Sequence, residues 1–324
     1  MFGSFRYIAF GLFLCALGLL PLGTRSFALE KQDSGALTHY IMGVFYEDLG
    51  DIDKAISEYG RALDSDNAAA IHLGLASSYV KKGSQKQAID ELSICIKLDP
   101  ESIEPHAILA ILYASLNKTN LAEQEYEAAL KNASKLEPKN AEIYKGLGSL
   151  YLKQDKLNEA EIVFKFALTL DPNDFDSHFY LGAIYDKLNK SALSEKELSR
   201  AIEIKPDFDI ALNYLGYIYA QQNRNLSKAQ DLIHKALKAD PNNAAYIDSL
   251  GWVYFRRGKI KEALKEIEKA DTLMEDPEIS DHLGEIYLKM GDVKKARASW
   301  EKSLKLDPQQ KLVKEKLDKL SKLK

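Results

Sequence analysis

Four of the six histidines in this chain of 324 residues recur at a regular spacing, and histidine is the commonest metal ligand and proton carrier near neutral pH. They are His39, His72, His106 and His178, and each stands fourth in one of a series of similar sequence units. Equivalent positions in stacked helical units lie at least about 8–10 Å apart, whereas zinc ligands lie about 2 Å from the ion. The spacing therefore favours histidines that pack between helices. A hydrolase with a metal on these histidines stays a minor alternative.

The chain contains none of the common catalytic or nucleotide-binding motifs. It has no Walker loop, no Gly-rich dinucleotide turn, and no Gly-x-Ser-x-Gly, His-Glu-x-x-His or Cys-x-x-Cys sequence. Its two cysteines, Cys15 and Cys95, cannot form a disulfide framework. Cys95 stands where other units have a small packing residue, so we expect a buried, unreactive thiol. We therefore expect no enzymatic activity, no cofactor and no metal site.

The composition is that of a globular protein, with 46% hydrophobic and 28% charged residues. This excludes collagen-like, low-complexity and broadly disordered chains. The formal net charge of −4 has the wrong sign for a protein that binds nucleic acid, because neutralising phosphates requires clustered Lys and Arg. The composition therefore defines a class but no substrate.

A tyrosine recurs at nearly regular intervals along most of the chain, and it has the same neighbours each time. Three residues before it stands Gly or Ala, with Leu or Met one position earlier, and another small residue follows in most units nine positions later. A small residue lets one helix approach the next closely, and the large residue beside it fills the remaining volume. The recurring tyrosines are Tyr46, Tyr79, Tyr113, Tyr151, Tyr185, Tyr219, Tyr254 and Tyr287.

This pattern resembles the tetratricopeptide repeat (TPR), a helix-turn-helix unit of about 34 residues. The resemblance implies an all-α fold, a right-handed superhelical solenoid of about eight such units with a capping helix at residues 309–324. A short linker, residues 29–35, precedes the units. The expected units span residues 36–68, 69–102, 103–140, 141–174, 175–208, 209–243, 244–276 and 277–308.

Polar residues at the start of several units are candidates for helix caps, namely Ser102, Asn140, Asn173, Asp207 and Asn242. The third unit is longer by about one helical turn, at residues 131–134, which preserves the helix face. In the last segment, residues 309–324, four apolar residues at helical spacing predict a helix that covers the end of the array. Its lysines leave open an attraction to anionic lipid or an acidic partner.

The TPR resemblance also implies a ligand surface, because the first helix of each unit lines the concave face in that family. In the later units this face carries aromatic side chains with polar groups between them, which is typical of a surface that anchors an extended peptide or a helix. The opposing interpretation is that Tyr217 and Trp252 only pack against neighbouring helices. The Lys and Asn clamp with which chaperone-tail adaptors hold a terminal carboxylate is absent. The candidate ligand-binding residues are Phe179, Asp186, Asn213, Tyr217, Asp248, Trp252, Phe255 and Arg256.

The first 28 residues have the features of a secretory signal peptide. Arg6 precedes an uncharged run from residue 7 to residue 20, which is short for a spanning helix, and Ser26 and Ala28 fit a cleavage site after Ala28. An uncleaved anchor remains the main alternative. Lipidation of Cys15 is disfavoured because the large Leu14 precedes it.

The sequence thus predicts an exported scaffold or adaptor without catalysis, periplasmic or associated with the cell envelope, that holds a protein or peptide segment in its concave groove. The later units, from about residue 248 onward, are also similar to exported bacterial TPR proteins, which supports a role in assembly or maintenance of a bacterial envelope. No nucleic acid is expected as a partner, and membrane contact would be peripheral. A sensor or carrier of a small peptide or glycan is the alternative function, and self-association through the concave face remains open.

Overall fold

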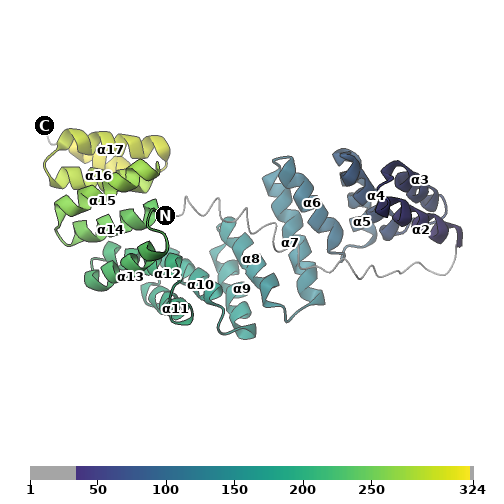
Figure 1. Ribbon diagram of the computed structural model, residues 1–324, viewed down its shortest axis with the longest axis horizontal. Helices are drawn as coiled ribbons and strands as arrows, with labels where there is room; N and C mark the ends of the chain where they lie inside the picture. Colours follow the sequence, from purple (N-terminus) through teal and green to yellow (C-terminus); the bar gives the residue numbers. More distant parts are fainter. Residues whose placement is uncertain (1–33, 322–324) are drawn as a thin grey trace. The chain divides into compact units, whose positions relative to one another are not determined.

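The computed structural model describes residues 34–321, and this part of the chain is all helical (Figure 1). It divides into two compact units, whose described parts are residues 34–170 and residues 171–321. The helices of the first unit are α2 (Ser34–Asp48), α3 (Ile52–Leu63), α4 (Ala69–Lys82), α5 (Gln85–Leu98), α6 (Glu104–Ser115), α7 (Thr119–Leu136), α8 (Ala141–Lys153) and α9 (Leu157–Leu170). Those of the second are α10 (Phe175–Lys187), α11 (Ser191–Ile204), α12 (Asp209–Gln221), α13 (Leu226–Ala239), α14 (Ala244–Arg256), α15 (Ile260–Leu273), α16 (Pro277–Lys289), α17 (Val293–Leu306) and α18 (Lys311–Ser321).

Within each unit the helices form consecutive pairs, and the second helix of one pair packs on the first helix of the next. The described residues contain eight such pairs followed by α18, so the predicted all-α architecture of helix-turn-helix repeats is confirmed. The predicted extra turn of the third repeat is also present, because α7 has 18 residues whereas α5 and α9 have 14 each.

The recurring small residues are the contact points that the spacing predicts. The ring of Tyr59 on α3 is fully buried between Gly43 on α2 and Gly74 on α4. A Cβ atom added at Gly43 would lie 2.6 Å from Tyr59 Cδ1, and one added at Gly74 would lie 2.6 Å from Tyr59 Cζ. The Tyr59 hydroxyl donates a hydrogen bond to Glu47, 3.0 Å away, which fixes the ring. One aromatic side chain of α3 thus packs against both α2 and α4.

The turn inside each pair contains a residue in the left-handed region of backbone conformation four residues after the recurring tyrosine, and the turn between α12 and α13 has a second one, Asn225. Such a conformation is open to Gly and tolerated by Asn and Asp, whose short polar side chains allow it. These residues are Gly50, Gly83, Asn117, Asp155, Asn189, Asn223, Gly258 and Gly291.

Helix caps follow the predicted positions in part. Asn140 caps α8 as expected, since its side chain accepts a hydrogen bond from the backbone of Glu142. The prediction is wrong by one residue at four other starts. Asp174 caps α10 in place of Asn173, and Asn243 caps α14 in place of Asn242, because neighbouring polar residues compete and the one with extended backbone before the first helical turn becomes the cap. At α6 and α12 the cap positions are held by Ile103 and Phe208 in place of Ser102 and Asp207, without a side-chain hydrogen bond.

The regularly spaced histidines are packing residues that form hydrogen bonds within their own repeats. The Nδ1 atom of each lies 2.6–2.7 Å from a carboxylate oxygen of a glutamate on the second helix of the same pair. Residues 34–321 contain no group of three or more His, Cys, Asp or Glu placed to hold a metal ion. The pairs are His39 with Glu58, His72 with Glu91, His106 with Glu125, and His178 with Glu197.

Helix α18 covers the end of α17, as the sequence predicts. Val313 and Leu320 are buried against Trp300, and Lys316 forms ion pairs with Asp281 at 2.7 Å and with a second carboxylate of α16. The prediction that Leu312 also belongs to the buried apolar face is wrong, because this side chain is 71% exposed.

The predicted signal peptide, its cleavage after Ala28 and most of the linker lie outside the described residues. Between residues 34 and 321, no helix has both the length and the apolar character needed to cross a bilayer.

Candidate functional site

Six of the eight predicted ligand-binding residues lie on α12 and α14, the first helices of two successive pairs, and α16, the first helix of the next pair, packs beside α14 in the second unit. The structure brings four of them together with two residues of α16 that the sequence pattern did not indicate, Glu278 and His282. We call this group the α12–α16 cluster. Its members are Tyr217, Asp248, Trp252, Phe255, Glu278 and His282.

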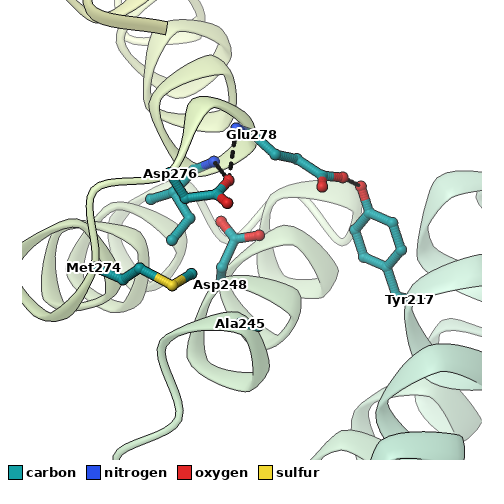
Figure 2. Close-up of a pocket in the computed structure, with 7 residues that line it drawn as sticks. Tyr217, Ala245, Asp248, Met274, Asp276 and Glu278 are labelled. Atoms are coloured by element: carbon teal, nitrogen blue, oxygen red, sulfur yellow. Dashed lines mark hydrogen bonds between the residues drawn. The ribbon is translucent and has the colours of Figure 1, made fainter. Parts of the chain in front are cut away.

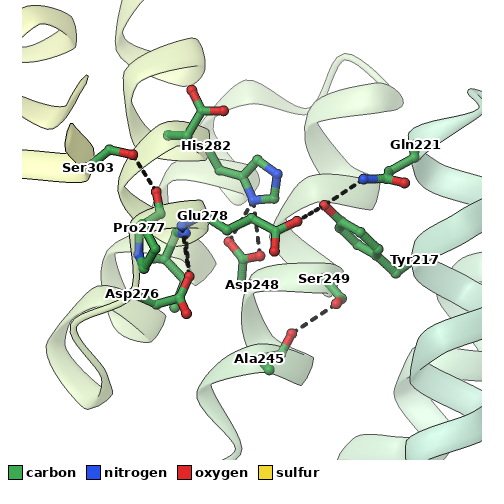
Figure 3. Close-up of polar contacts among 12 residues, drawn as sticks. Tyr217, Gln221, Ala245, Asp248, Ser249, Asp276, Pro277, Glu278, His282 and Ser303 are labelled. Atoms are coloured by element: carbon green, nitrogen blue, oxygen red, sulfur yellow. Dashed lines mark hydrogen bonds and ion pairs between the residues drawn. The ribbon is translucent and has the colours of Figure 1, made fainter. Parts of the chain in front are cut away.

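The centre of the cluster is a buried ion pair between α14 and α16 (Figure 3). Nδ1 of His282 lies 2.9 Å from Oδ1 and 3.0 Å from Oδ2 of Asp248, and both side chains are buried. Burial disfavours the imidazolium, but the negative charges of Asp248, Glu278 and Asp281 outweigh this effect and raise the pKa of His282. The raised pKa favours the protonated imidazolium, whose charge is opposite to that of the Asp248 carboxylate.

Trp252 is held in place by two stacked rings. Its indole lies 4.1 Å from the His282 ring, centroid to centroid, with an angle of 15° between the planes, and 4.9 Å from the Phe255 ring at 16°. Parallel stacking at these distances fixes the orientation of an aromatic side chain. The indole edge, with its Nε1 atom, has no hydrogen-bond partner among the described residues.

Tyr217 on α12 extends the cluster across to α16. Its hydroxyl donates a hydrogen bond to the carboxylate of Glu278 and accepts one from Gln221 Nε2 at 2.9 Å (Figure 3). Burial and the negative charge of Glu278 raise the pKa of Tyr217 well above its ordinary value, so the hydroxyl keeps its proton. Asp276 caps the start of α16 by accepting a hydrogen bond from the Glu278 backbone at 2.7 Å, and this places the glutamate.

A small cavity lies beside these side chains (Figure 2). Its volume of about 10 Å³ has room for about one water molecule, whereas pockets for small ligands typically measure about 300–1,000 Å³. This cavity does not fit a glycan or a peptide. The lining residues are Tyr217, Ala245, Asp248, Met274, Asp276, Glu278 and Ile279.

Three of the remaining predicted residues lie on α10 and α12. Phe179 is 2% exposed and packs against Phe208 and Tyr214, so it belongs to the core beneath the surface. Asp186 accepts a hydrogen bond from the Tyr214 hydroxyl at 3.1 Å, and burial raises its pKa. Asn213 is 2% exposed, and its Oδ1 atom has no partner among the described residues.

Arg256 follows Trp252 by one helical turn and, like it, has a side-chain nitrogen without a hydrogen-bond partner among the described residues. Its guanidinium lies 5.9 Å from the Trp252 ring centroid, a cation–π contact, and its Nε atom is buried without a hydrogen-bond partner among residues 34–321. Buried polar atoms without partners are uncommon in folded proteins. The predicted residues Asn213, Trp252 and Arg256 each carry one, and in all three the atom is buried beneath the surface of α12 and α14.

Sequence reasoning missed Glu278 because the candidates were taken from the fifth to the seventh unit only, and it missed His282 because the sixth position of a unit is not a ligand position in the family pattern. Both residues stand at positions where other repeats vary in residue type. One feature of the sequence could have indicated His282. It lies about one repeat length after Asp248, so the two ionisable residues stand at nearly equivalent positions of adjacent first helices.

The comparisons with known proteins identify the family of this repeat array. Residues 22–247 match the family model described as the cilia and flagella-associated protein 70 C-terminal domain, and residues 217–322 match the model of a tetratricopeptide repeat-like domain. The chain belongs to the tetratricopeptide repeat family.

One curated relative and two solved structures show the extent of the similarity. The chain is 32% identical over 111 residues to the type IV pilus assembly protein PilF of Pseudomonas aeruginosa, a match that spans 34% of this chain and 41% of that protein. A tetratricopeptide repeat protein from Parabacteroides merdae has a TM-score of 0.60 at 18% identity, covering 78% of this chain and 98% of its own. A chain of the APC/C hetero-tetramer Cut9–Hcn1 has a TM-score of 0.54 at 17% identity, covering 98% of this chain and 76% of its own. The two structures share the fold.

Proposed function

We propose that the protein is an adaptor or scaffold that holds a segment of a partner protein on the surface formed by α12, α14 and α16. The observation that supports this most directly is the stacked pair of Trp252 and Phe255, both partly exposed on α14 with the Arg256 guanidinium beside them. Rings supply binding energy through burial, and flanking polar groups supply direction.

The α12–α16 cluster favours rigid presentation as the mechanism. The Asp248–His282 pair and the stacking of Trp252 fix the aromatic surface before a ligand arrives. A preorganised surface pays little ordering cost on binding, so only the flexible ligand loses conformational freedom. No step of this function requires a cofactor, and no catalytic group is assigned.

We further propose that the protein works in a bacterial envelope after removal of its leader at Ala28. The similarity to a pilus assembly protein and the signal-like sequence of the first 28 residues support this location. Expression of the full chain in a Gram-negative host, followed by N-terminal sequencing of the periplasmic fraction, tests it. A mature N-terminus at Leu29 is expected, and a full-length protein retained in the membrane would contradict it.

The binding function is tested with a pool of dodecapeptides of random sequence, blocked at both ends, passed over the immobilised protein. Retention by the wild type and its loss in the variant Trp252→Ala, Phe255→Ala are expected. A Phe166→Ala variant serves as control, since this ring is exposed on α9 and lies outside the cluster. All variants should keep the helical circular dichroism of the wild type. Equal retention by the double variant would place the site elsewhere, and no retention by any protein would overturn peptide binding.

A further inference from the structure

Within each unit, one face of a first helix is covered by the second helix of the preceding pair. Leu112 of α6 packs with Leu92 of α5, and Ile286 of α16 packs with Ile267 of α15. Leu112 and Ile286 stand directly before the recurring tyrosine, and the residues at this position on α4, α6, α8, α12, α14 and α16 are at most 6% exposed. This position therefore belongs to the interior of the array. Its occupants are Ser78, Leu112, Leu150, Ile218, Val253 and Ile286.

In the first repeat the same face of α2 is uncovered. The residue before the tyrosine is Phe45, which is 51% exposed, and one turn earlier stands Ile41, which is 54% exposed. Ile41 is the counterpart of Gly74 on α4, where an added Cβ atom would lie 2.6 Å from a ring atom of the preceding helix α3. Residues of the interior type are thus left exposed on α2. With two further exposed leucines they form a row at four-residue spacing, the α2 stripe, which consists of Leu37, Ile41, Phe45 and Leu49.

The last pair of helices shows how such a face is covered at the other end of the array. There α18 lies on α17 and buries Val313 and Leu320 against Trp300. Among the described residues no helix precedes α2, so its stripe has no such cover. Terminal repeats require a polar or covered outer face, and a contiguous exposed apolar row marks an interaction site. The α2 stripe therefore has the properties of a surface that another molecule covers.

The charges of α2 favour a second copy of this helix, placed antiparallel, as the cover. The helix contains no Lys or Arg, its first turn contains no acid, and its two acids stand at its C-terminal end. Glu47 is buried and bonded to Tyr59, whereas Asp48 is exposed and forms no ion pair among the described residues. An antiparallel arrangement brings Asp48 of each copy to the first turn of the other α2, where a carboxylate is favourable. A parallel arrangement would bring the two Asp48 carboxylates together, which is unfavourable.

The spacing of the stripe also suits a two-fold arrangement. Twelve residues separate Leu37 from Leu49, so the stripe is about 18 Å long. When two such rows run in opposite directions about a two-fold axis, Leu37 lies beside Leu49 of the other copy, and Ile41 beside Phe45. Every apolar side chain of the row then faces another one.

We propose that two copies of the protein associate through the α2 stripe, with their α2 helices antiparallel. This inference does not rest on the α12–α16 cluster, because α2 belongs to the first unit. One helix face is smaller than a standard interface, which takes about 800 Å² from each partner, so the dimer is weak and its Kd is on the order of 10 µM.

Sedimentation velocity at protein concentrations from about 1 to 200 µM tests the association. The protein is used as purified from the expression host, with its N-terminus sequenced. The variant Ile41→Glu, Phe45→Glu places two charges on the stripe. Its matched control is Ile162→Glu, Phe166→Glu on α9, which changes the same residue types at the same spacing, also exposed, and alters the net charge equally. All proteins should keep the helical circular dichroism of the wild type.

Wild type and the α9 control are expected to change from monomer to dimer over this range, and the stripe variant to need at least about tenfold higher concentration. A wild type that stays monomeric throughout would leave the stripe to a different partner and overturn the proposal. If both variants weaken the dimer equally, the effect comes from net charge and the assignment to α2 fails. Undiminished association of the stripe variant would place the interface elsewhere.

Cross-linking tests the antiparallel arrangement with the single variants Leu37→Cys and Leu49→Cys. Under mild oxidation, an equal mixture of the two should form disulfide-linked dimers faster than either variant alone, because the new cysteines face each other only between unlike copies. Cys95 is buried and does not compete, and the wild type treated in the same way gives the background. Faster cross-linking of either variant alone would show a parallel arrangement and contradict the proposal.

Discussion

The packing of Tyr59 between two glycines makes Gly74→Ala a sharp test of how the repeats are held together. The added methyl group would lie 2.6 Å from Tyr59 Cζ, and 2.7 Å from Cε1, well inside van der Waals contact. The ring cannot move away easily, because Gly43 closes its other side and the hydroxyl is bonded to the buried Glu47. Overpacking of this kind costs about 1–3 kcal/mol of unfolding free energy.

The control is Gly60→Ala on α3, where no atom lies within 4 Å of the added methyl group. In a helix interior this change stabilises by about 0.5–1 kcal/mol, because alanine loses less backbone entropy on folding. Thermal unfolding followed by circular dichroism at 222 nm should show a midpoint roughly 3–10 °C lower for Gly74→Ala and a slightly higher midpoint for Gly60→Ala. Equal midpoints for the two variants would refute close approach at Gly74 as the basis of stacking.

Three further predictions concern the second unit and the buried thiol. The pKa of His282 is raised in the folded protein, so its ion pair contributes its full stabilisation below the ordinary pKa of 6.5 and loses it as the pH rises through the folded-state pKa. In urea titrations, the difference in unfolding free energy between the wild type and the double variant Asp248→Asn, His282→Gln should therefore become smaller from pH 6 to pH 9. A difference that grows over this range would contradict the pairing. Burial raises the pKa of Cys95 to about 11, so a disulfide reagent at pH 8 should label it in guanidinium but not in the native protein, and rapid native labelling would show that the thiol is accessible. Val313→Ala should cost about 2 kcal/mol because the side chain is 1% exposed, while Leu312→Ala should cost almost nothing; equal effects would mean that α18 does not cap the array.

Repetition made most of the fold predictable from the sequence. A single tyrosine with a small residue three positions before it indicates one contact between helices. Eight such occurrences at nearly regular intervals indicate a repeat array. The turn residues carry an equally regular signal, Gly, Asn or Asp four positions after the tyrosine, which emerged only from the backbone conformation. Cap positions were less predictable, because adjacent polar residues such as Asn242 and Asn243 are chemically equivalent and tertiary packing selects between them.

The candidate site was predictable in part, for a physical reason. Trp252 and Phe255 were identified because aromatic residues on a first helix are visible in one repeat. Their immobilisation by His282 depends on the next repeat, and the sequence pattern of one unit contains no information about a side chain packed from another. The glutamate partners of the four repeated histidines were missed for a similar reason, although their constant separation along the chain is visible once the helix pairs are known.

Hydrogen–deuterium exchange of the full chain, with and without the dodecapeptides that it retains, tests the central claim most directly. We expect slower exchange in α12, α14 and α16 when peptide is bound, with unchanged exchange in α2 to α5. Protection confined to the first unit, or no protection in the presence of bound peptide, would contradict the assignment of the binding surface.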